Sequence, residues 1–440
     1  MDLTYGWCRP SDRLLARLLP RWGQLEELSL GGHKAGAITD ASVSQLPDRC
    51  PRLRALSVGA CVGVTAEALA ALISTLPVLD DLSLGSVRLG PTGRATRHDN
   101  AAEMRALLPA VATGLPRRRL TRLALRGAAL GAAECRLLLG TGAWPSLVEL
   151  DLTEVRHAGT IFTCPTGQRL SLPWAALPRA CPMLKRLLLG GVGGAVGLDL
   201  SAPADMDAVV EVDAWELTVL ELQNVRTRWG SNVTVPKQSI PRMALDWFCR
   251  GALFLRRLDL TDRPEFGMDH LLAIVKLRPP LEELLIARTG AVIDKRGLSI
   301  PHVDGLNVFA REESSALAVV IAAFAPPTDD RWKAYFGPTY GSLRAAEFRL
   351  ETLDVSGGAF GADDESLARL GEVPRLRALD ASGTRVSDEG LRKAFASLRV
   401  ARRLTAFKVL HLEGCRGLSR RVRIAAHRGS AAEVRKALAF

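Results

Sequence analysis

Acidic side chains recur at one position of a repeated leucine pattern. In segments of the form Leu-x-x-Leu-x-Leu, the residue between the last two apolar positions is acidic at Asp151, Glu221, Asp259, Asp354 and Asp380. Two further carboxylates, Glu149 and Glu283, stand two positions earlier in their own segments. A row of carboxylates attracts basic groups and repels the phosphates of nucleic acid. The pattern therefore predicts a surface for a basic peptide or an arginine-bearing protein, and it disfavours nucleic acid as the partner.

A second candidate surface is aromatic. Four rings gather within residues 332–340 of a chain that is only 5% aromatic, and they are Trp332, Tyr335, Phe336 and Tyr340. Aromatic side chains carry much of the binding energy at protein interfaces, so this cluster is a candidate hot spot. The alternative is structural, because the same rings could pin a long loop against the rest of the fold.

Sequence motifs for catalysis are missing. We find no nucleophile elbow, no phosphate-binding loop, no HExxH and no paired metal-ligand spacing, and the seven histidines are scattered. None of the eight cysteines forms a CxxC pair, and Cys50, Cys61, Cys181 and Cys415 are expected to be small buried residues between repeats. We therefore expect no enzyme activity, no cofactor and no metal.

The elements that would position these side chains are repeats. The leucine segments begin at Leu25, Leu53, Leu79, Leu120, Leu147, Leu184, Leu217, Leu255, Leu281, Leu350 and Leu376, with a degenerate copy at Phe407. The shortest intervals, 26 to 28 residues, suffice for a strand, a turn, a helix and a return loop. Ser or Thr followed by an acidic residue, as in Ser387-Asp388, marks where helices open. One helix is expected to be capped by Thr39 or Asp40, to carry Val43 and Leu46 on its apolar face, and to be closed by Pro47 and Pro51.

Stacked units of this kind predict an α/β leucine-rich-repeat solenoid, a horseshoe with a parallel sheet on the concave face and helices on the convex face. The last two leucines of each segment should point into the core, and the residues flanking them should point onto the concave face. The central outward row would read Ser29, Ser57, Ser83, Ala124, Asp151, Leu188, Glu221, Asp259, Leu285, Asp354, Asp380 and His411.

The repeats resemble a known family. The stretch from Ile38-Thr-Asp through Cys50-Pro-Arg-Leu53 to Cys61, with partial copies at Cys181-Pro-Met-Leu184 and Leu412-Glu-Gly-Cys415, resembles the cysteine-containing leucine-rich repeats of F-box proteins, which have a ribonuclease-inhibitor-like fold. Val87, Ala128, Val155 and Thr384 stand where that family would have cysteine. No F-box precedes Leu25, so the resemblance places adaptor binding on no residue of this chain.

Composition and segment lengths suggest one elongated body. We expect a solenoid over residues 1–417 with an insertion at 290–349 that contains a helix over 312–325, followed by a capping helix or helix pair at 418–440. The net charge is +11, with basic clusters near Arg117–Arg119 and at the C-terminal end. The longest apolar run, Ala316–Ala325, is too short to span a membrane, and a signal peptide is missing, which favours a cytoplasmic or nuclear protein.

Together these features indicate a protein-recognition module. The family resemblance implies a substrate-recognition subunit of a ubiquitin ligase. A scaffolding protein of a larger assembly and a regulator that binds an enzyme in its groove remain open alternatives.

Overall fold

The computed structural model describes residues 11–30, 38–58, 63–84, 101–113, 119–130, 134, 137–138, 144–153, 156–157, 177–189, 217–221, 254–263, 266–268, 271, 274, 280–289, 315–324, 349–358 and 361–439. The chain forms two compact units. Unit 1 consists of Met1–Leu217 and Thr227–Pro236, and unit 2 consists of Thr218–Arg226 and Lys237–Phe440. The expected domain limits at 417 and 418 remain a prediction.

Each unit contains parallel strands that follow the order of the chain. In unit 1 these are β1 (Glu27–Leu30), β2 (Ala55–Val58), β3 (Asp81–Ser83), β4 (Arg122–Ala124), β6 (Glu149–Asp151) and β8 (Arg186–Leu188). In unit 2 they are β9 (Val219–Glu221), β10 (Arg257–Asp259), β11 (Glu283–Leu285), β12 (Thr352–Asp354), β13 (Ala378–Asp380) and β14 (Val409–His411). A short parallel pair, β5 (Ala129–Leu130) with β7 (Arg156–His157), accompanies the sheet of unit 1.

These strands confirm the predicted fold class, an α/β leucine-rich-repeat solenoid with a parallel sheet. Strand register places leucine beside leucine, as in Leu28 beside Leu56 and Leu353 beside Leu379. The leucines that precede and end each strand are also buried, for example Leu53 and Leu84, which are both 0% exposed. Stacked leucines therefore form the core, since burying apolar surface is the main force that holds one repeat on the next.

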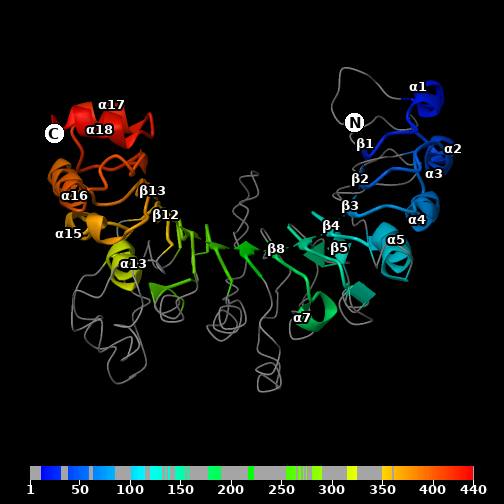
Figure 1. The fold of residues 1–440 in the computed structure, drawn as a ribbon, viewed down its shortest axis with the longest axis horizontal. Coiled ribbons are helices and arrows are strands. Elements are labelled where there is room, and N and C mark those ends of the chain that lie inside the picture. Colours follow the sequence, from blue (N-terminus) through cyan, green and yellow to red (C-terminus); the bar gives the residue numbers. More distant parts are fainter. Residues whose placement is uncertain are drawn as a thin grey trace. The chain divides into compact units, whose positions relative to one another are not determined.

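Helices lie on one side of the strands in each unit, and the last two helices of unit 2 lie over the end of its strand stack (Figure 1). In unit 1 they are α1 (Asp12–Leu18), α2 (Asp40–Val43), α3 (Leu46–Arg49), α4 (Ala66–Thr75), α5 (Ala101–Thr113) and α7 (Leu177–Ala180), with a 3-10 turn η1 at Leu19–Arg21. In unit 2 they are α13 (Ala316–Phe324), α15 (Asp364–Ala368), α16 (Asp388–Val400), α17 (Arg420–Ala426) and α18 (Ala431–Ala437), with η7 at Leu370–Glu372. We call the side of each sheet opposite these helices the open face.

Two expected helices differ in extent. The helix expected between Thr39 and Pro47 forms as two short pieces, α2 and α3, and Pro47 stands in the first turn of α3 instead of closing a helix. Proline is favoured in a first turn but disrupts a helix interior, so the chain starts a new helix there. The helix expected over 312–325 is present as α13, which packs against α15 and is buried at every residue except Ala318; residues 312–314 and 325 lie outside the described residues.

Aspartates at helix starts join successive repeats. In each case the carboxylate accepts a hydrogen bond from the backbone N–H of the N-cap residue of a later helix, at 2.7 to 3.0 Å. The pairs are Asp12 with Thr39, Asp40 with Thr65, Asp364 with Ser387, and Asp388 with Ser419. We call these pairs the capping ladder. Hydroxyl groups of Thr39, Thr65 and Ser387 also donate to the same carboxylates, so the ladder fixes the start of one helix on the start of the helix before it.

Turns before the strands share one geometry. The N–H of Leu53 donates to the carbonyl of Cys50 at 3.0 Å, and the N–H of Leu184 donates to that of Cys181 at 3.1 Å. Trp144 takes the same place before Leu147, with a distance of 3.2 Å. Cys50, Cys181 and Cys415 are buried and form no disulfide with a described residue, and burial raises the pKa of the Cys181 thiol to about 12. Cys61 lies outside the described residues.

Turns after the strands of unit 2 use left-handed backbone. Gly357 has φ +89°, while Asp262 and Arg288 adopt φ 61° and 52°, a region that costs energy for residues other than glycine. The Arg288 guanidinium donates two hydrogen bonds, each 2.6 Å, to the Asp262 carboxylate. This bidentate ion pair offsets the unfavourable backbone at both residues. The corresponding turn after β4 in unit 1 has Gly127, with φ 69°.

The last strand is covered along its outer edge. The N–H of Leu410 donates to the carbonyl of Gly429 at 3.1 Å, and the N–H of Ala431 donates to that of Lys408 at 3.0 Å. Ser430 thus forms an antiparallel bridge with Val409 of β14. An uncovered strand edge would present unpaired backbone groups, so this pairing between α17 and α18 closes the edge.

Candidate functional site

Two rows of side chains run along the open face of each unit. The leading row stands just before the central leucine of each strand, and the central row stands just after it. In unit 1 the leading row is Glu27, Ala55, Asp81, Arg122, Glu149 and Arg186, and in unit 2 it is Val219, Arg257, Glu283, Thr352, Ala378 and Val409. The central row has the residues that the repeat pattern predicts, and their Cα atoms are partners in register within each unit.

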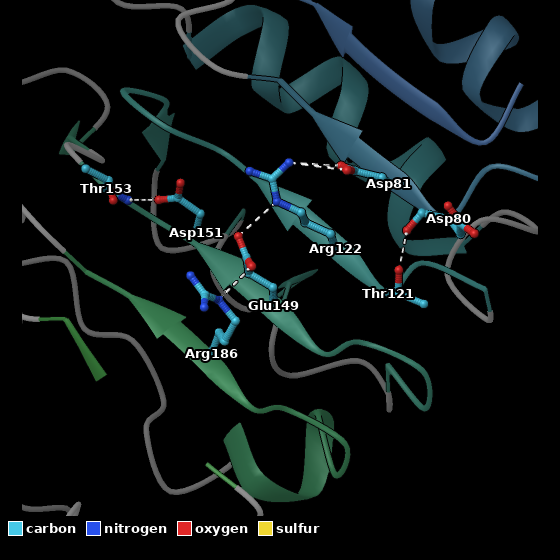
Figure 2. Close-up of polar contacts among 8 residues, drawn as sticks. All are labelled: Asp80, Asp81, Thr121, Arg122, Glu149, Asp151, Thr153 and Arg186. Carbon is cyan, nitrogen blue, oxygen red and sulfur yellow. Dashed lines mark hydrogen bonds and ion pairs between the residues drawn. The ribbon is translucent and has the colours of Figure 1, made fainter. Parts of the chain in front are cut away.

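Alternating charges connect four strands of unit 1 (Figure 2). The guanidinium of Arg122 lies 3.2 Å from a carboxylate oxygen of Asp81 and 2.9 Å from one of Glu149. Glu149 also accepts Arg186 at 2.9 Å through its other oxygen. Burial raises the pKa of Asp81, although the charge of Arg122 works in the opposite direction. The four residues form a charge ladder in which each arginine is matched by a carboxylate.

One arginine lies within ion-pair distance of three carboxylates in unit 2. Arg257 lies 3.2 Å from Glu221 and 2.5 Å from Glu283, which belong to the strands on either side of it. Asp259, on the same strand, is 3.9 Å away. The arginine therefore neutralises one of three negative charges, and the surface around it stays acidic.

Four central-row aspartates bind their own backbone. Each accepts a hydrogen bond from the N–H two residues later, as Asn and Asp commonly do in turns. The pairs are Asp151 with Thr153 at 2.8 Å, Asp259 with Thr261 at 3.0 Å, Asp354 with Ser356 at 2.9 Å, and Asp380 with Ser382 at 2.9 Å. These carboxylates thus shape the turn that follows their strand, whatever else they do.

Exposure divides the candidate residues into two classes. Asp151 and Asp259 are 6% and 3% exposed, so their carboxylates are largely turned into the protein. Asp354 and Asp380 are half-buried neighbours in register, and neither is ion-paired with a described residue. Burial raises the pKa of Asp354 and the charge of Asp380 adds to the rise, while hydrogen bonds from Ser356 and the charge of Arg288 act to lower it. Glu283 is the most exposed of the charges around Arg257, with 39% of its side chain accessible.

The fold brings only part of the predicted site together. Glu221, Asp259 and Glu283 gather around Arg257, and Asp354 with Asp380 continues the same face of unit 2, while Asp151 belongs to unit 1. The aromatic candidates Trp332, Tyr335, Phe336 and Tyr340 lie outside the described residues. Partner binding at all of these positions remains a prediction.

The arginines of the leading row were missed by the sequence analysis. Arg122, Arg186 and Arg257 stand two residues before Ala124, Leu188 and Asp259 of the central row, so they share its face of the sheet. Reading both outward positions of every repeat would have found them. In the part of the chain that the structure describes, no three His, Cys, Asp or Glu residues lie together as metal ligands would. Nor does any described helix have the length and apolar character needed to cross a membrane.

Comparisons with known proteins provide little further information. No family model matches the sequence, and no curated protein does. One solved structure to which the fold is similar is a chain in the crystal structure of the Rad7 and Elc1 complex from yeast. The similarity has a TM-score of 0.42 at 16% sequence identity, and it covers 86% of this chain and 81% of that one.

Proposed function

We propose that the chain is a protein-recognition module that binds a basic segment of a partner protein on the open face of unit 2. One observation carries the proposal. Five carboxylates stand in the two open-face rows of unit 2 against a single arginine, Arg257; Asp259 is buried, and the four that are accessible are Glu221, Glu283, Asp354 and Asp380. A surface with this excess of negative charge is complementary to lysine and arginine side chains.

The spacing of the strands suits such a partner. Neighbouring strands are about 4.8 Å apart, so carboxylates of adjacent strands present negative charge at short, regular intervals. Asp354 and Asp380 are such neighbours, and both lack an ion-pair partner among the described residues. The charge of Arg288 acts on both carboxylates, and a lysine or arginine of a partner placed over them would offset the repulsion that remains between the two like charges. Nucleic acid is disfavoured here, because its phosphates would meet the carboxylates.

The test uses asparagine substitutions. Asparagine keeps the side-chain oxygen that accepts the N–H of Ser356 or Ser382, so Asp354→Asn with Asp380→Asn removes charge and preserves both turns. We expect the double variant to bind the partner recovered by affinity purification about tenfold more weakly, as two lost charge contacts imply. Glu365→Gln is the matched control, because Glu365 is an exposed carboxylate on α15, away from the open face. Equal affinity of the wild-type chain and the double variant would refute the proposal.

The identity of the partner separates three more specific roles. Recovery of a cullin and its adaptor would support a substrate-recognition subunit of a ubiquitin ligase, which is the role that the repeat resemblance implies. Recovery of structural proteins alone would support a scaffold. Recovery of one enzyme whose activity changes on binding would support a regulator. We propose no catalytic activity for the chain itself.

A further inference from the structure

A cleft of about 290 Å³ opens beside the last repeat of unit 2. Its floor comprises Phe395 from α16 together with Leu404 and Phe407 from the segment between α16 and β14. Its rim includes Lys408, which directly precedes β14, and Arg435 of α18. The cleft therefore lies where the segment that covers the edge of β14 meets the preceding helix, and it includes none of the open-face rows.

The floor is apolar and is part of the packed protein. Phe395 and Phe407 are only 2% and 4% exposed, so their rings are held in place by the core. Leu404 is half-buried beside them. A rigid hollow of this kind accepts one aliphatic or aromatic side chain, because ligand sites combine an apolar base with a few polar groups that fix orientation.

The rim is positively charged. Lys408 is exposed and Arg435 is half-buried, and neither is paired with an acidic residue that the structure describes. None of the described residues that line the cleft is acidic. The surrounding chain is basic as well, since residues 416–440 contain seven Lys or Arg and one Glu, a net charge of +6 (7 − 1). That one carboxylate, Glu433, lies 3.4 Å from Arg428.

We propose that this cleft binds a short acidic segment of a second protein, which inserts one apolar side chain between flanking carboxylates. The apolar side chain would occupy the hollow over Phe395 and Phe407, and the carboxylates would pair with Lys408 and Arg435. This site is separate from the open face of unit 2 and has the opposite charge. The chain would thus have two recognition surfaces, one for a basic partner and one for an acidic partner.

Fluorescence anisotropy with labelled peptides tests the proposal. The probes are four peptides with the core Glu-Asp-X-Asp-Glu, in which X is Phe, Leu, Trp or Ala. We expect at least one of the Phe, Leu and Trp peptides to bind the full chain about tenfold more tightly than the Ala peptide, because only these fill the hollow. Lys408→Glu with Arg435→Glu should weaken that peptide at least about tenfold, since attraction becomes repulsion at both positions.

Two controls make the result specific. Lys436→Glu changes a neighbouring exposed charge of α18 that does not line the cleft, and we expect less than about a twofold effect because Lys436 cannot pair directly with a bound carboxylate and acts only through solvent. Ala432→Trp fills the mouth from an exposed position of α18 and should block the Phe peptide without any change of charge. The proposal is overturned if no peptide binds, if the identity of X makes no difference, or if Lys436→Glu weakens binding as much as the double variant. It is also overturned if a single-stranded oligonucleotide competes with the bound peptide and shows the same dependence on Lys408 and Arg435. Because none of these variants touches the open-face rows, this outcome is independent of the test with Asp354→Asn and Asp380→Asn.

Discussion

Units 1 and 2 have the same leucine core but differ in the chemistry of the open face. In unit 1 the two rows contain four carboxylates, Glu27, Asp81, Glu149 and Asp151, and two arginines, both of which are paired in the charge ladder. In unit 2 the rows contain five carboxylates and one arginine. The excess of negative charge is thus two in unit 1 (4 − 2) and four in unit 2 (5 − 1).

This difference separates what the fold requires from what it leaves free. The leucines must face the core in every repeat, because stacking of neighbours is the source of stability in a solenoid. The outward residues meet no such requirement, so their charges can either satisfy one another or remain available to a partner. In unit 1 the charges on strands β3 to β8 pair with one another. The proposed function rests on charges in unit 2 that remain available to a partner.

The largest expected effect concerns the turns. In Gly357→Ala the new Cβ would overlap Cγ of Arg288, at a residue whose φ is +89°. We expect a loss of about 2–3 kcal/mol in the free energy of unfolding, because left-handed strain adds to displacement of the Arg288–Asp262 ion pair. Gly127→Ala in unit 1, with φ 69°, should lose about 1 kcal/mol from strain alone.

Urea unfolding followed by hydrogen exchange in each unit would measure both losses. The variant pair Gly357→Ala and Arg288→Ala is the control, because removing the arginine side chain should reduce the cost of the alanine. Equal losses of unfolding free energy for Gly357→Ala and Gly127→Ala would show that displacing the Arg288–Asp262 ion pair adds nothing to the backbone strain.

The capping ladder should make similar contributions in both units. Asp364→Ala removes the acceptor of the Ser387 N–H at 2.8 Å, and Asp40→Ala removes that of the Thr65 N–H at 2.7 Å. We expect each substitution to cost about 1–2 kcal/mol in unfolding free energy, because a partly buried backbone N–H and a hydroxyl lose their acceptor. Glu365→Ala, next to Asp364 but exposed, is the matched control and should be near neutral. If Asp364→Ala or Asp40→Ala lowered the unfolding free energy by less than Glu365→Ala does, the capping ladder would not stabilise the fold.

Removing a charge from the two open faces should have opposite effects. Glu149→Gln leaves Arg122 and Arg186 without their shared carboxylate and should cost about 1 kcal/mol, a small value because both arginines are more than 40% exposed. Asp354→Asn keeps the hydrogen bond to Ser356 and removes a charge that burial disfavours, so unit 2 should be unchanged or slightly more stable at neutral pH.

The pH dependence of stability shows whether the charge of Asp354 stabilises or destabilises the folded chain. Burial raises the folded-state pKa above 3.8, so the charged carboxylate lowers stability once the pH rises through that raised pKa. Any gain from Asp354→Asn should therefore appear at neutral pH and vanish below pH 3.8. Chemical unfolding of both proteins at several pH values would show this, and a gain that grew toward low pH would contradict it.

The smallest effect is expected in the pH dependence of stability that comes from Asp12, the first carboxylate of the capping ladder. Burial acts to raise its pKa, but hydrogen bonds from Ser42 and Thr39 outweigh burial and lower the pKa below 3.8. A lowered pKa stabilises the folded chain above the unfolded value of 3.8, and this stability is lost as the pH falls through the folded pKa. The difference in unfolding free energy between wild type and Asp12→Ala should accordingly shrink at acidic pH. A difference that stayed constant from pH 7 to low pH would disprove this role.

The strands, their register and the central row could be predicted because one requirement repeats. Each Leu-x-x-Leu-x-Leu segment must bury the same leucines, so the outward residues follow from alternation along a strand. Substitution of the repeat cysteine was also readable in part. Thr384 stands in its repeat at the place that Cys415 holds in the next repeat. The Thr384 hydroxyl and the Cys415 thiol both donate to the carbonyl of Ala381, at 2.6 and 3.2 Å.

Features that depend on contacts between repeats could not be predicted. The capping ladder joins residues 23 to 31 positions apart, and nothing in one repeat shows which serine or threonine an aspartate will meet. The sequence also does not show that Asp151 and Asp259 are buried while Asp354 and Asp380, which make the same turn hydrogen bond, are half-buried. Asp262 and Arg288 take a turn position that glycine fills at Gly357, and the ion pair between them is a contact that neither repeat shows by itself.

Zero-length carbodiimide cross-linking of the chain to its purified partner tests the central claim most directly, because this reagent joins carboxylates to lysines only where the two are in contact. We predict that partner lysines become linked to peptides of unit 2 that contain Glu283, Asp354 or Asp380. Links confined to exposed helix carboxylates such as Glu365 and Glu389, with none on the open-face strands, would contradict recognition by the acidic face.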